Sequence, residues 1–335
     1  MENVKSKCDV LSCIQPTGDV TLGNYFGAIQ NWVELQENNQ CIYGIVDLHT
    51  MTKGLDAKSL RHYTDQMIVD LLACGIDPSK STLFVQSLVP EHTELSWILS
   101  TFASYGELSR QIQFKTHHQN NESTNVGLFS YPILQAADIL IYKAKRVPVG
   151  IDQKQHLELT RSIANKFNNK YGELFPIPEM ELTETPKIMS LTNPSMKMSK
   201  SAGEKHFVRL FEEEAILREK IKSAVTDTVV KEGEMSEGVE SLFNLLKASG
   251  AQDEYKSLIG DFEKGNLKYS NLKEALADSL VNLTGELRYK RAQIQGDISL
   301  IHDTIRDMSA KARQLAQETL FEVKQCTGVK SISNF

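Results

Sequence analysis

The 335-residue sequence has no apolar run near the ~20 residues that a membrane-spanning helix needs. Its start, MENVKSKCDV, contains lysines but no apolar stretch behind them, so it is not typical of a secretory signal. The five cysteines are scattered and form no C-x-x-C pair, which argues against a disulfide framework and against a zinc site. These absences predict a cytoplasmic protein with no membrane partner and no structural metal.

Basic residues are not in excess either. The sequence has 37 Lys and Arg and 43 Asp and Glu, which gives a formal net charge of −6. Nonspecific binding to nucleic acid depends on Lys and Arg clustered at the phosphates, so we expect no DNA partner, while a local basic patch stays compatible with this balance. Hydrophobic residues make up 41 % and charged residues 24 %, as in ordinary globular proteins. The length suits one large domain or two.

The first 200 residues alternate short apolar runs with longer helical patterns. The apolar runs, which predict strands, are VLSCI (10–14), CIYGIV (41–46), STLFVQ (81–86) and VPVG (147–150). Helices are expected over residues 23–37, 58–74, from 91 onward and over about 152–167. This alternation predicts an α/β fold with a parallel, Rossmann-like sheet over residues 1–204.

The character of the sequence changes after residue 204. Residues 205–325 are rich in Glu, Lys, Leu and Ala, with one apolar stripe per segment and no clear strand. Apolar residues spaced by three and four from Ile298 to Leu315 predict a long amphipathic helix. We therefore expect an all-α region over residues 205–295 and a closing helix within 296–335 that packs back on the α/β domain. The polar segment 115–127 predicts a mobile loop.

Two stretches of small and polar residues are the candidates for chemistry. The first turn, PTGDVTLGN (16–24), follows a predicted strand and opens a helix, which is an arrangement that brings backbone N–H groups to an anion. It matches neither G-x-G-x-x-G nor the P-loop, and alone it fits an ordinary strand–helix turn equally well. The KMSKS loop (197–201) has two lysines three residues apart that could reach one set of phosphates, or could belong to a solvated linker.

With both stretches present, the chain resembles the class I aminoacyl-tRNA synthetases, and among them the bacterial tryptophanyl-tRNA synthetases. TLGN (21–24) is similar to that family's form of the HIGH signature, and QPTG (15–18) matches the residues before it. The resemblance continues over residues 10–230 through VDLH (46–49), AADIL (136–140), VPVG (147–150), DQKQH (152–156) and KIKSAVTD (220–227). It implies a tryptophan–tRNA ligase that activates L-tryptophan with ATP and Mg²⁺ and transfers it to the 2′-hydroxyl of the terminal adenosine of tRNA(Trp).

The resemblance also implies the residues of the site. The catalytic residues would be Thr21, Asn24, Lys197 and Lys200. The ATP-binding residues would be Gln15, Pro16, Thr17, Gly23, Asn24, Lys115, Gly150, Ile151, Asp152, Ile188, Lys197, Met198, Ser199, Lys200 and Ser201. The tryptophan-binding residues would be His49, Tyr131, Gln135, Asp138 and Gln153. Ile151 stands where family members often carry Glu, so only a backbone contact is expected there.

Asp138 can also be interpreted without the resemblance. Tyr131, Gln135, Asp138 and Tyr142 recur at i, i+4, i+7 and i+11 and would share one face of a helix that is otherwise apolar. A carboxylate in such a helix needs a hydrogen-bond donor. An indole N–H is only a donor, so Asp138 suits the recognition of tryptophan, although an aspartate that bonds a neighbouring loop is the alternative. His49 could likewise be a structural histidine.

Three other functions fit parts of the sequence. A tyrosyl-tRNA synthetase shares the implied fold, but its bacterial members carry a further C-terminal RNA-binding module. A nucleotidylyltransferase also uses a HIGH-like turn, but it needs neither an amino acid nor the helical region. A non-catalytic relative would be expected to lack Lys200 or Asn24, and both are present.

The resemblance further implies a homodimer and a role for residues 205–295 in receiving the anticodon. The helical stretch 95–108, within the expected interface segment 91–127, has enough apolar residues for a dimer surface or for the core of the monomer. We expect no editing domain, because a competitor that lacks the indole N–H would leave Asp138 unpaired.

Overall fold

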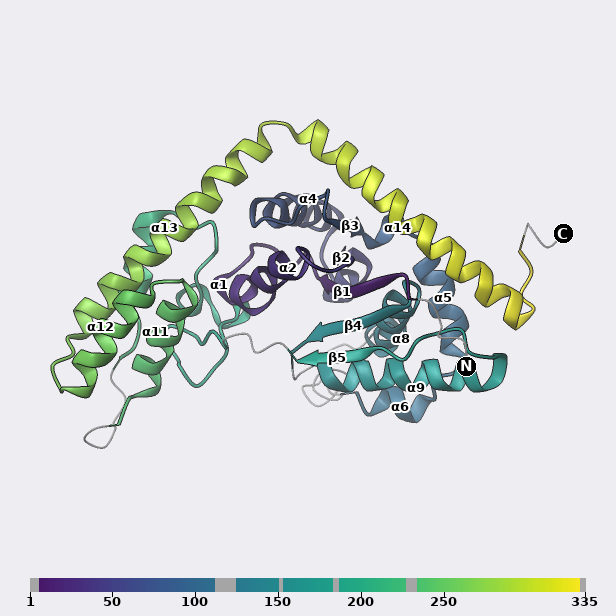
Figure 1. Cartoon of the computed structure of the whole chain (residues 1–335), viewed down its shortest axis with the longest axis horizontal. Helices are drawn as coiled ribbons and strands as arrows, with labels where there is room; N and C mark the ends of the chain where they lie inside the picture. Colours follow the sequence, from purple (N-terminus) through teal and green to yellow (C-terminus); the bar gives the residue numbers. More distant parts are fainter. Residues whose placement is uncertain (1–5, 112–124, 151–152, 183–186, 227–233, 332–335) are drawn as a thin grey trace.

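Five parallel strands form the centre of the protein (Figure 1), in a computed structural model that describes residues 6–111, 125–150, 153–182, 187–226 and 234–331. The strands are β1 (Cys8–Ile14), β2 (Cys41–Ile45), β3 (Ser81–Val85), β4 (Ala144–Val149) and β5 (Glu179–Leu182), in the order β3-β2-β1-β4-β5. The four predicted strands and the parallel sheet are confirmed. Strand β5 was not predicted, because this edge strand reads EMEL and carries no apolar run.

The helices of the α/β part follow the strands. They are α1 (Leu22–Asn24), the π-helix η1 (Tyr25–Ile29), α2 (Gln30–Leu35), α3 (Asp47–Thr50), α4 (Ala57–Ala73), α5 (Glu91–Ser100), α6 (Tyr105–Ser109), α8 (Val126–Leu140) and α9 (Lys154–Tyr171), with 3₁₀ turns η2 (Met51–Lys53) and η3 (Gln86–Leu88). The predicted helices are confirmed with small shifts at their ends. The π-helix between α1 and α2 was not predicted.

The polar segment 115–127 was expected to be a loop. Residues 112–124 lie outside the described residues, and Val126 and Gly127 belong to α8, so the expectation was wrong at these two positions. The physical reason is an N-cap. The side chain of Asn125 accepts a hydrogen bond of 2.8 Å from the backbone N–H of Leu128 and so starts the helix earlier.

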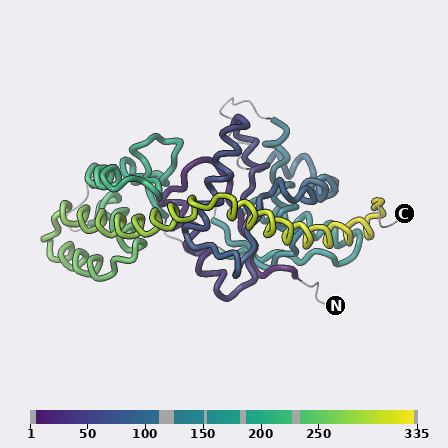
Figure 2. Tube along the Cα trace, turned by 90° about the horizontal axis from the view of Figure 1, so that it is seen from above, coloured from purple at the N-terminus to yellow at the C-terminus, as the bar shows by residue number. Residues whose placement is uncertain are grey.

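The second half of the chain is helical. Beyond the 3₁₀ turns η5 (Lys200–Ala202) and η6 (Glu204–His206), it contains α10 (Glu214–Ser223), α11 (Glu237–Ala248), α12 (Gln252–Glu263), α13 (Tyr269–Gln295) and α14 (Ile298–Thr327). Figure 1 shows that α11 to α13 gather beside the sheet, and that α13 and α14 meet at a bend and form an arch over it. In Figure 2, seen from above, the same two helices run end to end across the molecule. The long amphipathic helix predicted from Ile298 is confirmed.

Helix α14 covers the edge of the sheet that β3 forms. It packs on β3 and α5, where the Arg313 side chain donates to the Glu91 carboxylate at 2.9 Å. The backbone N–H of Val85, at the edge strand, donates to the Ser309 hydroxyl at 3.3 Å. A covering helix of this kind removes a free strand edge that could pair with another chain.

Alternate residues of β1, β2 and β3 face two apolar clusters. Val10, Tyr43 and Val85 contribute to the cluster that contains α2, α4 and α13, whereas Leu11 and Phe84 contribute to the cluster that contains α5, α8 and α9. The sheet is therefore covered on both faces, as expected for parallel strands. Within the described ranges, no helix has both the length and the apolar character needed to cross a bilayer.

Gly238 in α11 offers a test of this packing. A Cβ added at Gly238 would lie 2.3 Å from the backbone oxygen of Val225, which cannot move aside as a flexible side chain can. We expect Gly238→Ala to lower the free energy of unfolding by about 2–3 kcal/mol, as overpacked positions do. The measurement is urea unfolding followed by circular dichroism.

The matched control is Gly260→Ala in α12, where an added Cβ meets no heavy atom within 4 Å. This substitution should raise the free energy of unfolding by roughly 0.5–1 kcal/mol, because Ala favours a helix interior more than Gly does. Equal effects of the two substitutions would contradict the packing described here.

Candidate active site

A cavity of about 320 Å³ opens at the carboxyl ends of β1 and β4. The strand order reverses between these two strands, and in open parallel sheets such a reversal leaves a crevice in which ligands bind. Seven of the residues implied by the sequence line the cavity: Gln15, His49, Tyr131, Gln135, Asp138, Gly150 and Gln153. Much of the remaining lining is apolar and includes Leu11, Trp32, Val46, Ile139, Val147 and Val149.

Asp138 is the charged residue of this cavity, and its side chain is only 4 % exposed. Its carboxylate accepts hydrogen bonds from His49 Nε2 at 2.8 Å, from Gln86 Nε2 at 2.8 Å and from His92 Nδ1 at 2.6 Å. An ionised carboxylate can only accept, so both of these imidazole nitrogens must carry a proton. Burial raises the pKa of Asp138, but the hydrogen bonds from His49 and His92 outweigh it and hold that pKa well below its ordinary value.

The two carboxylate oxygens are not used equally. Oδ1 accepts from both Gln86 and His92, whereas Oδ2 accepts from His49 alone among the described residues. A carboxylate oxygen can accept more than one hydrogen bond, so Oδ2 has room for a donor from a ligand in the cavity. The arrangement is therefore a fixed, ionised acceptor in a mostly apolar cavity.

Gln86 and His92 were missed by the sequence analysis. Gln86 directly follows β3, so its position at the carboxyl edge of the sheet was a usable signal. His92 lies 46 residues from Asp138 in sequence, and no local pattern pairs them. Tyr142 lies just past the end of α8, so the expected shared helix face does not extend that far. It still reaches the same group, since its hydroxyl is 2.8 Å from His92 Nε2.

A second group of polar side chains, which includes Tyr131 and Gln153, also lines the cavity. The Tyr131 hydroxyl makes a short hydrogen bond with His156 Nε2, and His156 Nδ1 lies 3.1 Å from Gln153 Oε1. Burial raises the pKa of Tyr131, so its hydroxyl stays protonated at neutral pH. These contacts fix the orientation of two of the side chains implied for amino-acid binding.

The first turn closes on itself through an N-cap. The backbone N–H and the hydroxyl of Thr21 donate to Asn24 Oδ1 at 3.0 and 2.9 Å, and the backbone N–H of Asn24 donates to the Thr21 hydroxyl at 3.2 Å. Thr21 is buried, and its hydroxyl is occupied by the cap. Thr21 therefore orients Asn24, whose side chain lies at the surface.

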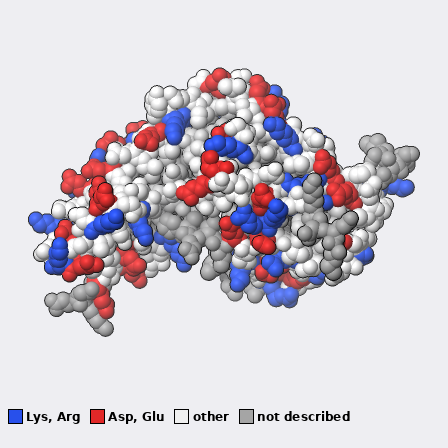
Figure 3. Space-filling view, viewed as in Figure 1, with Lys and Arg blue, Asp and Glu red and all other residues white. Residues whose placement is uncertain are grey.

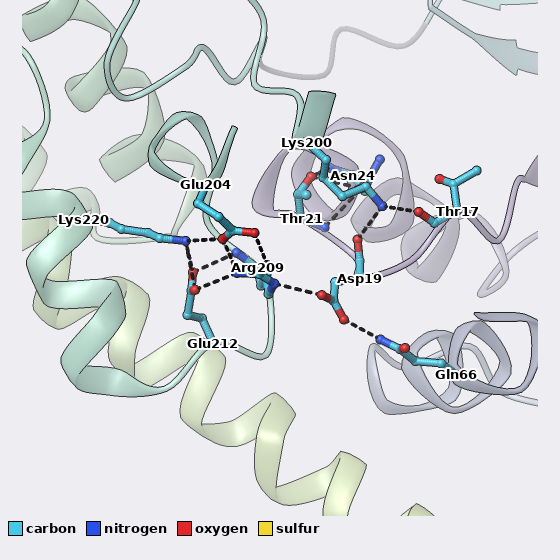
Figure 4. A network of polar contacts seen from close by, with 10 residues as sticks. All are labelled: Thr17, Asp19, Thr21, Asn24, Gln66, Lys200, Glu204, Arg209, Glu212 and Lys220. Carbon is cyan, nitrogen blue, oxygen red and sulfur yellow. Dashed lines mark hydrogen bonds and ion pairs between the residues drawn. The ribbon is translucent and has the colours of Figure 1, made fainter. Parts of the chain in front are cut away.

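The KMSKS loop lies against this turn, as Figure 4 shows for Lys200. The Lys200 ammonium donates to the backbone oxygens of Thr17 and Asp19 at 3.0 and 2.9 Å, and burial lowers its pKa. Met198 is buried, and its Cβ would lie 3.6 Å from a Cβ placed on Gly23, so the two segments are in close contact.

The other members of the KMSKS loop differ in their surroundings. The backbone N–H of Met198 donates to the oxygen of Ile188 at 2.9 Å, and the hydroxyls of Ser199 and Ser201 lie 2.8 Å apart. The Lys197 side chain is exposed. The structure thus places Lys200, but not Lys197, on the first turn. Lys115, Ile151 and Asp152 lie outside the described residues.

The chain matches known proteins over almost its whole length. The family model described as tRNA synthetases class I (W and Y) matches residues 2–284. A tryptophan–tRNA ligase of Clostridium tetani is 41 % identical over 328 residues, covering 96 % of each chain. One of Clostridium acetobutylicum is 42 % identical over 330 residues, covering 97 % of this chain and 98 % of its own.

Solved structures agree with these matches. Tryptophanyl-tRNA synthetase from Campylobacter jejuni, complexed with ADP and tryptophan, is 35 % identical with a TM-score of 0.84, and the match covers 96 % of this chain and 100 % of that one. The enzyme from Mycoplasma pneumoniae is 32 % identical with a TM-score of 0.87, covering 98 % and 99 %. The sheet and the helical half are both included in these matches.

The charge on Asp138 predicts a pH dependence of stability. Because its pKa is lower in the folded protein than in the unfolded chain, the ionised carboxylate stabilises the fold at neutral pH. That stabilisation is lost progressively as the pH falls below about 4, where the unfolded chain takes up the proton first. The advantage of the wild type over Asp138→Asn in urea unfolding should therefore be largest near neutral pH and shrink as the pH falls below about 4. A difference that does not change with pH would contradict an ionised Asp138.

Proposed function

The chain belongs to the class I tRNA synthetases for tryptophan and tyrosine, and from this premise we propose how its cavity and its two signature segments divide the reaction between them. Its activity is the ligation of tryptophan to tRNA, as in relatives that are 41 and 42 % identical over nearly the whole chain. The tyrosyl-tRNA synthetase of Archaeoglobus fulgidus, in contrast, is 19 % identical and shares the fold. The observation that carries the assignment within this site is the buried, ionised Asp138.

Asp138 recognises the indole. Its Oδ2 accepts the indole N–H, while His49, Gln86 and His92 keep the carboxylate ionised and fixed. The apolar lining from Leu11, Val46 and Ile139 surrounds the ring system. Tyr131, Gln135 and Gln153 hold the amino group and the carboxylate of the amino acid. A smaller amino acid loses apolar contacts, and one without the N–H leaves a buried charge unpaired.

ATP occupies the edge formed by the first turn and the KMSKS loop. The backbone of Gln15 to Thr17, Gly23 and the exposed amide of Asn24 hold the phosphates, as helix N-termini and tight turns do for anions. The adenosine lies along Ile188, Met198 and the segment 150–152. Lys200 and Lys197, with Lys115, neutralise the pyrophosphate, and Ser199 and Ser201 complete the loop around it.

Mg²⁺ arrives with ATP. Among the described residues, no group of three His, Cys, Asp or Glu side chains is placed to hold a metal ion. In this proposal the ion is bound mainly through the substrate phosphates, which is the usual mode for Mg²⁺ at nucleotide sites. Once bound, the ion adds positive charge at the phosphates, and the positioning of the substrates depends on the residues of the chain.

The reaction has two steps. The tryptophan carboxylate attacks the α-phosphorus of ATP, the bond to the β-phosphate oxygen breaks, and pyrophosphate leaves. The carboxylate is already ionised at neutral pH, so this step needs alignment and charge neutralisation and no general base. The 2′-hydroxyl of the terminal adenosine of tRNA(Trp) then attacks the activated carbonyl carbon, loses its proton, and AMP leaves.

In this proposal the helical region receives the tRNA. The α/β region forms the contact between the two subunits of a homodimer. Residues 205–295 receive the anticodon, and residues 296–335 return to the catalytic region, residues 1–204. Leu95, Leu99 and Leu108 are buried in the monomer, but Trp97 and Tyr105 are 76 % and 75 % exposed. These aromatic side chains, on α5 and α6, favour a dimer surface there. Action on tRNA(Trp) favours the cytoplasm.

ATP–pyrophosphate exchange with each aromatic amino acid tests the assignment. We expect exchange with tryptophan and at least ~100-fold less with tyrosine or phenylalanine, because neither offers an indole N–H to the buried carboxylate. Asp138→Asn should lower kcat/KM for tryptophan by roughly 100-fold, because the amide presents one acceptor oxygen and leaves the neighbouring donors mispaired. The matched control Asp77→Asn, at an exposed turn, should leave exchange unchanged. Exchange with tyrosine instead of tryptophan would contradict the proposal.

A further inference from the structure

The segment that follows the KMSKS loop is fastened to the first turn by its backbone. The backbone N–H of Leu22 donates to the oxygen of Val208 at 3.0 Å, and that of Leu210 donates to the oxygen of Val20 at 2.8 Å. Thr21 and Arg209 form an isolated antiparallel bridge between the two segments. The two segments are therefore joined directly through their backbones.

An ion pair adds a second connection at the same place (Figure 4). The carboxylate of Asp19, in the first turn, accepts from Arg209 Nε at 2.8 Å and from Gln66 of α4 at 2.7 Å. Arg209 also donates to Glu204 and to Glu212, at 2.7 and 3.2 Å. Asp19 is thus the partner through which the Arg209 side chain reaches the first turn, whereas Glu204 and Glu212 lie on the same segment as Arg209.

The geometry of the turn connects this ion pair to Lys200. Gly18 has a φ of +99°, which L side chains rarely adopt, and it lies between Thr17 and Asp19. The backbone oxygens of these two neighbours hold the Lys200 ammonium at 3.0 and 2.9 Å. Asp19 therefore holds Arg209 through its side chain and Lys200 through its backbone oxygen.

We propose that Asp19 and Arg209 are positioning residues, whose ion pair keeps the KMSKS loop on the first turn and thereby sets where the Lys200 ammonium meets the phosphates of ATP. The proposal rests on the proposed function for the role of Lys200 in ATP activation. Asp19, Arg209 and Lys200 are outside the lining of the cavity that holds Asp138. The ion pair therefore acts on the nucleotide and leaves the recognition of tryptophan unchanged.

Steady-state exchange kinetics of four variants test the ion pair. The variants are Asp19→Asn, Arg209→Gln, the double variant and the matched control Glu204→Gln, which removes a partner of Arg209 that is off the first turn. Each single variant should raise KM for ATP by roughly 5- to 10-fold, since small displacements of a positioned group have large effects, with KM for tryptophan within about 2-fold. The double variant should be about as impaired as the worse single variant, because the two residues act through one contact. Glu204→Gln should match the wild type.

A labelling experiment tests the same ion pair without reference to the reaction. Trace acetylation of the free protein, analysed by mass spectrometry, gives the reactivity of Lys200 relative to the exposed Lys197 as an internal standard. We expect this ratio to rise roughly 3- to 10-fold in Asp19→Asn and Arg209→Gln, because an ammonium released from two carbonyls is more accessible, and to stay unchanged in Glu204→Gln.

The two experiments separate the possible failures. Absence of tryptophan-dependent exchange in the wild type would overturn the proposed function, while the labelling ratio would still decide whether the ion pair positions Lys200. If the wild type shows normal exchange, three results would overturn the positioning role. These are an unchanged labelling ratio in the single variants, additive effects in the double variant, and a rise in KM for tryptophan equal to that for ATP. Thermal unfolding of each variant identifies any general loss of the fold.

Discussion

A buried negative charge is the constraint on which the site depends. Asp138 is almost fully removed from water, and an isolated carboxylate in such surroundings would take up a proton. It stays ionised because His49, Gln86 and His92 donate to it. These donors follow β2 and β3 or lie on α5, so the charge exists only when the sheet and its flanking helices are assembled.

The two segments that we propose for ATP binding also meet at this edge of the sheet. The first turn follows β1. The KMSKS loop, although 183 residues away in sequence, contacts this turn through Met198 and Lys200. In the proposed function, the cavity around Asp138 binds the amino acid, and the two segments joined by Lys200 bind ATP. Helix α14 covers the edge of β3 and is fixed to α5 through Arg313 and Glu91, which connects the helical half to the elements behind Asp138.

Much of this could be predicted from the sequence. Four strands, the main helices and the parallel sheet follow from apolar runs and helical spacing. The need of Asp138 for hydrogen-bond donors follows from its position in an apolar helix, whereas its role in binding tryptophan was implied by the family resemblance. Strand β5 carried no such signal, because edge strands need little apolar surface. Gln86 carried a usable signal in its position directly after β3. His92 and the Asp19–Arg209 pair could not be predicted from local patterns, since each acts with a partner at least 46 residues away that only folding brings near.

The central claim is that an ionised Asp138 recognises the indole N–H. The most direct test is the affinity of the free protein, by calorimetry, for tryptophan and for its benzothiophene analogue, in which sulfur replaces the N–H with little change of shape. We expect at least ~100-fold weaker binding of the analogue, because the buried carboxylate would be left without its donor. Equal affinities would contradict it.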